Sequence, residues 1–272
     1  MQQQVIQEQR QRPRPTFRAV EVRKTARITP HVVRVTLGGP ELEGYTSRGP
    51  ASHIKVFFPK DGERLPVMPT WGPNGPVMAE GRQRPTSRTY TPLQWRPDAL
   101  ELDVDFLVHG EGPGSQWAER AKPGDMVVIS GPGSAHQPNV ETDWCILAGD
   151  ESALPAISTI LESLPATLPT RVYIEVANKD EVQTLNGPSQ LQVEWLERGS
   201  DTESIGAVLL DTLVKAPFPE GNGSVWVGCE ASVMRSIRAH LLNDRGLDRS
   251  MIHTQGYWKY GALNHPDHDM GD

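Results

Sequence analysis

The sequence predicts two domains, an antiparallel β-barrel followed by an α/β domain built on a doubly wound parallel sheet. The chain has 272 residues, which is enough for two domains of ordinary size. In the first half, short segments rich in Val, Ile, Phe and Thr are separated by turn sequences such as PKDGE and KPGD, a pattern typical of antiparallel barrels. In the second half, apolar strand segments alternate with helical segments, which favours a parallel sheet.

The barrel is expected to span residues 17–139, with strands over residues 17–24, 29–37, 53–58, 87–91, 100–108 and 126–131. Residues 100–108 have the sequence LELDVDFLV, so one face of this strand is apolar and the other acidic. Residues 59–87 form a long connection that contains six prolines. A connection of this length is either a surface insertion or a functional cover.

The α/β domain is expected to span residues 140–262, with strands over residues 144–148, 171–177, 191–196 and 224–228. Helices are predicted within residues 149–164 and over residues 204–214 and 231–244. Residues 1–16 are rich in Gln, Arg and Pro and are expected to be a disordered tail. Residues 263–272 are expected to be a polar tail.

Composition excludes several classes of protein. The net charge of −7 argues against a general nucleic-acid binder, which needs a basic face. Apolar stretches are far shorter than the roughly 18–20 residues of a membrane helix. The chain has two cysteines, Cys145 and Cys229, too few for a disulfide scaffold or a four-thiolate metal site, and we expect no metal site. No apolar signal segment begins the chain, so we expect a cytoplasmic monomer that binds no membrane.

The strand end Arg88-Thr89-Tyr90-Thr91 has residue types that can bind a pyrophosphate and a flat ring. An arginine can bind a pyrophosphate through paired hydrogen bonds. The tyrosine two residues later shares the same face of the strand and can present its ring to a flat ligand. The threonine hydroxyl can donate to or accept from a ring nitrogen. The motif is short, and an ordinary strand with an exposed arginine is the alternative interpretation.

A glycine-rich segment, HGEGPGSQWA, follows the next long strand and is predicted to open a short helix. Glycines allow close backbone approach, and the N–H groups of a helix N-terminus can bind an anion. Ser115 is the predicted N-cap of this helix.

Acidic residues follow two strands of the predicted α/β sheet, at the edge where ligands bind in such sheets. Asp150 and Glu151 would repel a pyrophosphate unless their side chains turn away, and the alternative is that they cap the helix that follows. Cys229 lies either where a nicotinamide approaches or in the core. Near the C-terminus, Tyr257 and Trp258 either cover a flat ligand or belong to a last strand on the sheet.

These motifs occur in the order RTYT, HGEGPGSQWA, KPGD, AGDESALPAI, VGCEASVMRSIRAHL, GLDR and GYWKYG. In that order they strongly resemble the siderophore-interacting protein family, FAD-dependent ferric-siderophore reductases of the ferredoxin-reductase-like superfamily. The likeness extends from about Phe17 to Gly261 and includes PTWGPNGPVMAEGRQRP. It implies a flavin-binding barrel and an NAD(P)H-binding α/β domain. It also implies a ferric siderophore as substrate, and NADPH, NADH or possibly ferredoxin as electron donor. Rival activities are a flavin reductase for another acceptor and a siderophore carrier without nucleotide turnover.

The resemblance implies site residues of three kinds. Residues implied at FAD are Arg88, Thr89, Tyr90, Thr91, Asp105, Val108, His109, Gly114, Ser115, Gln116 and Trp117. Residues implied at the nicotinamide nucleotide are Gly149, Asp150, Glu151, Ser152, Ala153, Gly228, Cys229 and Glu230, with Tyr257 and Trp258 over the flat rings. The implied siderophore pocket holds Lys55, Lys259 and Arg249. No indispensable acid–base residue is expected, because the cofactor carries the chemistry. The chain has Gly114 where the family often has Ala, and Lys259-Tyr260 where it often has a pair of arginines.

Overall fold

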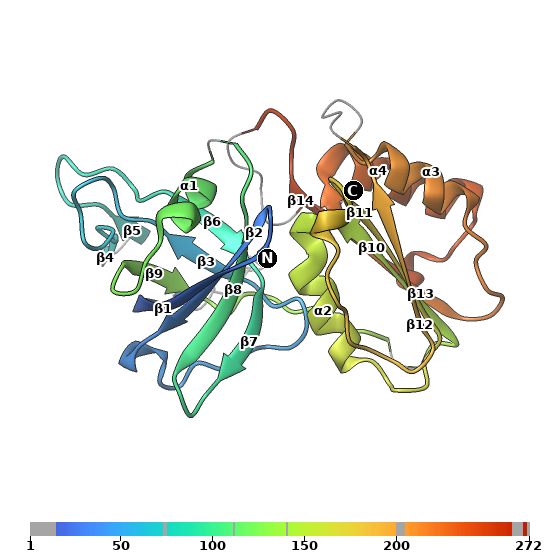
Figure 1. Cartoon of the computed structure of the whole chain (residues 1–272), viewed down its shortest axis with the longest axis horizontal. Helices are drawn as coiled ribbons and strands as arrows, with labels where there is room; N and C mark the ends of the chain where they lie inside the picture. Colours follow the sequence, from blue (N-terminus) through green and yellow to red (C-terminus); the bar gives the residue numbers. More distant parts are fainter. Residues whose placement is uncertain are drawn as a thin grey trace, which may run out of the picture.

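The computed structural model describes residues 15–72, 75–110, 112–139, 141–199, 205–262 and 269–270. The two predicted tails lie almost entirely outside these ranges, as does Glu111 of the glycine-rich segment. The chain forms a barrel and an α/β domain that lie next to each other (Figure 1).

The barrel is a seven-stranded antiparallel sheet with the order β6-β3-β9-β1-β2-β8-β7. Its strands are β1 (Phe17–Thr29), β2 (Val32–Gly38), β3 (Ile54–Phe57), β6 (Ser87–Tyr90), β7 (Pro92–Arg96), β8 (Glu101–Leu107) and β9 (Met126–Ser130). The edge strands β6 and β7 are joined by Thr91 alone. The two edges of the sheet must therefore meet, and the sheet curls into the predicted barrel. A short helix η1 (Pro40–Leu42) and helix α1 (Pro113–Arg120) complete this half.

The predicted two-faced strand is confirmed in β8. Leu102, Val104 and Phe106 are fully buried in the barrel core. On the opposite face, Asp105 accepts hydrogen bonds from Arg34 at 2.7 and 2.8 Å. Alternation of apolar and charged side chains thus separates a dry interior from a paired exterior.

Three features of the barrel differ from the prediction. The strand expected over residues 29–37 begins at Val32, because β1 continues to Thr29 before the chain turns. Strand β7 was missed, because its five residues PLQWR begin with proline and include no β-branched residue. The long connection contains a hairpin of β4 (Thr70–Gly72) and β5 (Gly75–Val77), which extends away from the barrel (Figure 1).

The second half is a five-stranded parallel sheet with the order β12-β11-β10-β13-β14. The strands are β10 (Trp144–Asp150), β11 (Thr170–Val176), β12 (Leu191–Glu197), β13 (Gly223–Glu230) and β14 (Ile252–Trp258). The chain builds outward from β10 to β12 and then returns to add β13 and β14 on the other side. This reversal is the topological switch of a doubly wound sheet, so the predicted fold class is confirmed. The last aromatic segment forms strand β14 rather than a separate cover.

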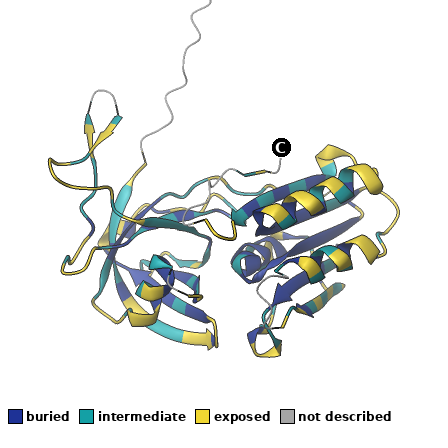
Figure 2. Cartoon of the chain, turned by 90° about the horizontal axis from the view of Figure 1, so that it is seen from above, coloured by how far each residue is buried: buried dark blue, intermediate teal, exposed yellow. Residues whose placement is uncertain are grey.

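Helices cover both faces of this sheet, with buried strands between half-exposed helices (Figure 2). Helix α2 (Leu154–Ser163) packs on one face, and α3 (Ala207–Lys215) and α4 (Ala231–Ala239) pack on the other. Short helices η2 (Glu151–Ala153), η3 (Lys179–Glu181) and η6 (Arg249–Met251), and a π turn η5 (His240–Asp244), complete the domain. In the described part of the chain, no helix has the length and apolar character to span a bilayer.

Candidate functional site

Tyr90 lies at the end of β6 against the start of helix α1. Its ring packs on Phe106 with ring centroids 4.3 Å apart, and Phe106 packs on Trp117 of α1 at 5.3 Å. A Cβ atom on Gly114 would lie 2.1 Å from the Tyr90 hydroxyl oxygen. The missing side chain therefore lets the Tyr90 hydroxyl reach the first turn of α1. An alanine, which the family often has at this position, would collide with the Tyr90 hydroxyl in this arrangement.

The N-terminus of α1 has no side-chain cap. Pro113 occupies the start of the helix and Gly112 is its N-cap. The prediction that Ser115 is the N-cap is wrong, because proline fixes its φ angle and begins the helix earlier. The Ser115 hydroxyl instead accepts a hydrogen bond from the His109 backbone N–H at 2.7 Å. The first backbone N–H groups of α1 have no partner within the helix, so they can bind an anion.

Arg88 and Tyr90 share one face of β6, because alternate residues of a strand point the same way. The half-buried Arg88 donates to the Ser87 carbonyl at 2.8 Å. Thr89 lies opposite Lys55 of β3 and faces the other way. A guanidinium, a tyrosine hydroxyl and an uncapped helix N-terminus are thus grouped in one place. This donor set fits a dinucleotide pyrophosphate.

His109 follows β8 and lies near the α/β domain. Partial desolvation lowers the pKa of His109 below its usual value, and the Glu151 carboxylate opposes that shift. The preceding residue, Val108, donates its N–H to the His31 carbonyl at 2.7 Å. Asp105 is not brought to this group, because it pairs with Arg34 on the face of β8 that lies opposite Phe106.

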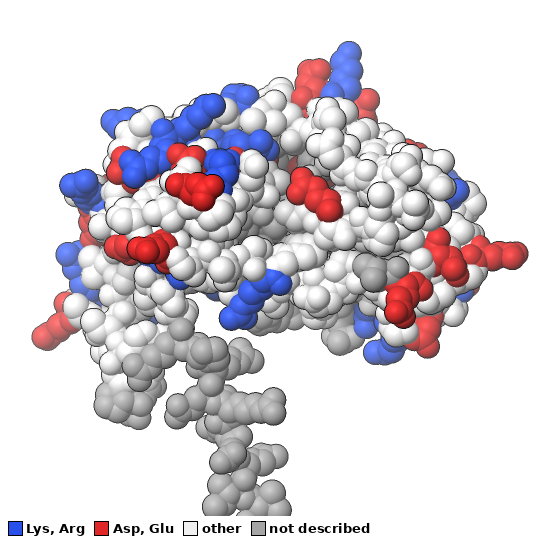
Figure 3. All heavy atoms as spheres, turned by 90° about the horizontal axis from the view of Figure 1, so that it is seen from below, with Lys and Arg blue, Asp and Glu red and all other residues white. Residues whose placement is uncertain are grey.

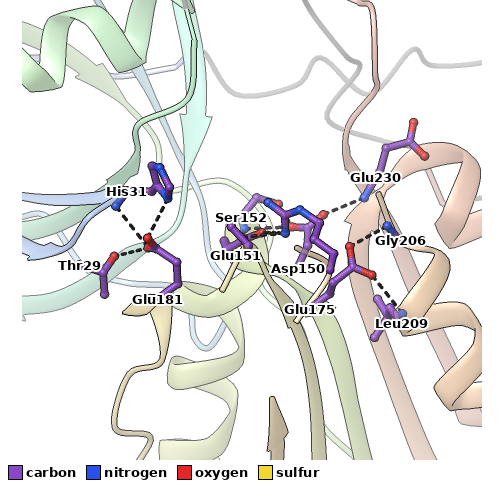
Figure 4. A network of polar contacts seen from close by, with 12 residues as sticks. Thr29, His31, Asp150, Glu151, Ser152, Glu175, Glu181, Gly206, Leu209 and Glu230 are labelled. Carbon is purple, nitrogen blue, oxygen red and sulfur yellow. Dashed lines mark hydrogen bonds and ion pairs between the residues drawn. The ribbon is translucent and has the colours of Figure 1, made fainter. Parts of the chain in front are cut away.

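The carboxylates of Asp150 and Glu151 are turned into the protein at the end of β10 (Figure 4). Asp150 accepts hydrogen bonds from the Ser152 backbone N–H at 2.9 Å and from the Trp258 indole N–H at 2.8 Å. Glu151 accepts a hydrogen bond from the Ala177 backbone N–H at 2.7 Å and forms an ion pair with Arg198 at 2.8 Å. Burial raises the pKa of Asp150 to about 6, and the neighbouring Glu151 adds to that shift. These carboxylates therefore serve the fold, as the capping alternative predicts.

Two further buried carboxylates hold the other loops at this edge of the sheet. Glu230 caps α4 by accepting from the Ser232 and Val233 backbone N–H groups at 2.6 and 3.0 Å. Glu175 of β11 accepts from Gly206 and Leu209 at 2.7 and 3.0 Å and so fixes the start of α3. Sequence reasoning missed Glu175. Its only signal was an acidic residue inside the apolar strand RVYIEVA.

The side chain of Cys229 is removed from the expected nucleotide site. It is 1% exposed and packs in the core with α3 and α4. Burial raises the pKa of Cys229 well above its usual value, so it remains a thiol. Ala153 is likewise fully buried. Gly149 and Gly228 face each other on neighbouring strands, where a Cβ on Gly149 would lie 2.5 Å from the Gly228 carbonyl oxygen. Close strand packing therefore requires glycine at 149.

Tyr257 joins the two domains. Its hydroxyl forms a side-chain hydrogen bond with Thr91, the residue that links the two barrel edges. The Tyr257 ring packs edge-on against Trp226 of β13 at 6.0 Å, and burial raises the pKa of its hydroxyl. The predicted ligand segment RTYT therefore meets the carboxyl edge of the parallel sheet.

Two of the expected siderophore residues, Lys259 and Arg249, lie at opposite ends of β14. Lys259 is exposed directly after β14, at the carboxyl edge of the sheet. Arg249 is exposed in η6, before the same strand begins. A whole strand separates them, about 20 Å at about 3.3 Å per residue. The structure does not bring Arg249 together with Lys259.

An antiparallel barrel followed by a doubly wound five-stranded parallel sheet is the two-domain fold of the ferredoxin-reductase-like FAD- and NAD-binding proteins. Residues 21–136 match the siderophore-interacting FAD-binding domain, and residues 142–261 match the siderophore-interacting protein domain. The chain belongs to the siderophore-interacting protein family.

Relatives of this chain include ferric reductases. Ferric vibriobactin reductase ViuB of Vibrio cholerae is 35% identical over 245 residues, and 89% of each chain is covered. The NADPH-dependent ferric-chelate reductase of Escherichia coli is 31% identical over 251 residues, covering 89% of this chain and 92% of that protein. The crystal structure of a siderophore utilization protein from T. fusca has a TM-score of 0.84 and 36% identity, covering 93% of this chain and 97% of that chain.

Proposed function

We propose that this protein is a cytoplasmic ferric-siderophore reductase that uses FAD and takes electrons from NADH or NADPH. One NAD(P)H and two ferric siderophores yield NAD(P)⁺, one proton, two ferrous ions and two free siderophores, since each nicotinamide supplies two electrons. Fe(II) binds hard oxygen ligands much less tightly than Fe(III), so reduction releases the iron. The relatives from Vibrio cholerae and Escherichia coli, which are named ferric reductases, support this reaction.

The observation that carries the proposal is the hydrogen bond between Thr91 and Tyr257. Thr91 ends the segment that also presents Arg88 and Tyr90, and Tyr257 lies near the carboxyl end of β14. A ligand in the barrel cradle and a nucleotide at the sheet edge would therefore meet at this contact. The inward-turned carboxylates of Asp150 and Glu151 remove the charge conflict that a nucleotide pyrophosphate would otherwise face.

The residues of the chain bind and orient rather than transfer protons. Arg88, Tyr90 and the α1 N-terminus would hold the FAD pyrophosphate, and Trp117 and His109 would border it. Bound FAD supplies the exchange between two-electron and one-electron chemistry. Lys55 and Lys259 would give the substrate pocket a local positive potential that attracts an anionic siderophore.

Absorption spectroscopy followed by anaerobic mixing tests this function. The purified protein should show two visible flavin bands and release FAD on denaturation. NADH or NADPH should bleach these bands, and a ferric siderophore should restore them while a ferrous chelator detects Fe(II). A colourless protein that takes up no added FAD would overturn the proposal.

The same experiment separates the rival activities. Faster reduction of free flavin or of another acceptor than of any ferric siderophore would indicate a general flavin reductase. Tight siderophore binding without response to either nucleotide would indicate a carrier or a ferredoxin-dependent protein.

A further inference from the structure

The carboxylate of Glu181 is buried where the α/β domain meets the barrel (Figure 4). Glu181 ends the short helix η3 that follows β11, and its side chain is 1% exposed. It accepts a hydrogen bond from the Thr29 hydroxyl at 2.5 Å, and its other oxygen lies 2.7 Å from His31 Nδ1. The His31 backbone N–H also donates to it at 3.3 Å. All of these donors belong to the β1–β2 turn of the barrel.

Glu181 depends on the barrel for its hydrogen bonds. In the part of the chain that the structure describes, the hydrogen bonds and the ion pair of its carboxylate all come from Thr29 and His31 of the barrel. A buried carboxylate is costly unless donors replace its water. Those donors are in reach only when the two domains are docked in this orientation. The contact therefore favours one arrangement of the domains over others.

The β1–β2 turn is connected directly to the flavin cradle. The His31 carbonyl accepts the N–H of Val108 at 2.7 Å, which extends the pairing of β2 with β8. Val108 precedes His109, where the glycine-rich segment begins. Glu181 is therefore hydrogen-bonded to the turn at the end of the β2–β8 pairing, and the glycine-rich segment begins directly after that pairing, at His109.

We propose that Glu181 is a positioning residue, an interdomain latch that fixes the nucleotide-binding domain relative to the flavin cradle. The proposal rests on the nucleotide as electron donor in the proposed function. Glu181 lies just after the second strand of the sheet, a region that meets the ribose in doubly wound nucleotide-binding domains. Lys179 and Asp180 of the same short helix are exposed. A nucleotide that contacts them would therefore contact the element that carries the latch.

Anaerobic stopped-flow mixing tests the latch by comparing two reactions of the flavin. Glu181→Ala and Thr29→Val should slow flavin reduction by NADH or NADPH about 10- to 100-fold, because small misplacements of reacting groups cost rates of that order. Re-oxidation of dithionite-reduced protein by ferricyanide should change less than about twofold, because it needs no nucleotide alignment. Thr29→Ser keeps the hydroxyl and should retain the wild-type rates. Glu194→Ala, at an exposed position on β12, is the matched control.

A second readout uses flavin-free protein. The unfolding free energies of the two single variants and the double variant should be non-additive, because the two side chains form one contact. Small-angle scattering of Glu181→Ala should show a larger radius of gyration than that of the wild type.

Wild-type flavin reduction rates in both single variants, equal slowing of the two reactions, or additive unfolding energies would overturn the latch. If neither nucleotide reduces the wild-type flavin, the proposed electron donor fails. The scattering and the thermodynamic cycle would still decide the latch in that case.

Discussion

Buried acidic residues at the carboxyl edge of the parallel sheet accept hydrogen bonds from the chain's own backbone. Asp150, Glu175 and Glu230 each accept backbone N–H groups at the start of a helix or of a loop that precedes one. Each bond satisfies a donor that would otherwise be left without a partner. The edge where nucleotides bind is thus fixed in shape by carboxylates that face inward.

Asp150 should give folding stability a distinct pH dependence. Its pKa is raised from 3.8 to about 6, so the folded state holds the proton more tightly than the unfolded state. Stability from this group is therefore full at low pH and is lost as pH rises through about 6. Relative to Asp150→Asn, the unfolding free energy of the wild type should fall by about 1.4 kcal/mol between pH 5 and pH 7.5.

Urea denaturation of both proteins across that pH range measures this difference. The asparagine keeps an oxygen acceptor for the Ser152 N–H and removes the titration. Its amide nitrogen cannot accept from the Trp258 indole N–H or the Glu230 N–H, which lowers stability by an amount that does not depend on pH. Parallel stability curves for the two proteins would show that Asp150 does not titrate in this range.

Lys55 and Lys259 should act on substrate binding alone. On the face shown in Figure 3, Lys and Arg gather over the barrel, while Asp and Glu are more frequent over the α/β domain. Replacing either lysine by alanine should raise the KM for an anionic ferric siderophore about tenfold, since a lost charge contact of about 1.4 kcal/mol has that effect. The kcat and the FAD content should not change.

Steady-state kinetics with an anionic and a neutral ferric siderophore measures this effect. Lys215→Ala is the matched control, because Lys215 is exposed on α3 and pairs only with Asp211. Loss of flavin with an unchanged KM would contradict the assignment of the lysines to the substrate pocket.

At the scale of elements, local patterns predicted the order of strands and helices along most of the chain. Alternation in β8 and the apolar run of β10 were sufficient for those strands, because burial of side chains decides them. The hairpin strands and β7 were missed, since they are only three to five residues long and β5 and β7 contain proline. The Glu181 contact was also missed. It joins residues 152 positions apart in the sequence, and no local pattern reports such a partner.

The β4–β5 hairpin lies in the connection between β3 and β6, residues 58–86, which we call the excursion. Residues of the excursion contact one another. Arg82 pairs with Glu63 at 2.8 Å within the excursion, and the Phe58 N–H donates to the Thr86 carbonyl at 2.9 Å where it begins and ends. Its exposed apolar residues include Trp71 and Val77, at 38% and 53%. The barrel therefore does not depend on the hairpin for its core.

Replacing residues 60–84 by a short glycine-rich turn should leave the fold and the FAD content intact. The unfolding free energy should change by less than about 1 kcal/mol, because loop shortening alters mainly the closure entropy. Urea denaturation and the flavin absorbance of the shortened protein measure this. A loss of flavin would instead make the excursion part of the cofactor site.

At the scale of the whole molecule, the domains meet at several separate contacts, which include a hydrogen bond from the Ala51 N–H to the Thr159 hydroxyl at 2.9 Å. The Thr91–Tyr257 bond lies beside the flavin segment, and the Glu181 contact lies at the β1–β2 turn. The residues proposed to hold FAD, Arg88, Tyr90 and the N-terminus of α1, all lie in the barrel. Flavin binding and domain orientation should therefore be separable properties of this protein.

Removal and restoration of FAD test that separation. FAD that binds only the folded barrel stabilises it by mass action, by about 2.7 kcal/mol at a free concentration 100 times its Kd. The Tm of flavin-free protein should therefore rise with the logarithm of added FAD. Arg88→Ala should need a higher FAD concentration for the same rise, because it removes a phosphate-binding group from the cradle. Glu181→Ala should show the wild-type rise, because its contact lies outside the cradle. A wild-type response in Arg88→Ala would show that Arg88 does not hold FAD. A weaker rise in Glu181→Ala would show that FAD binding depends on the orientation of the domains.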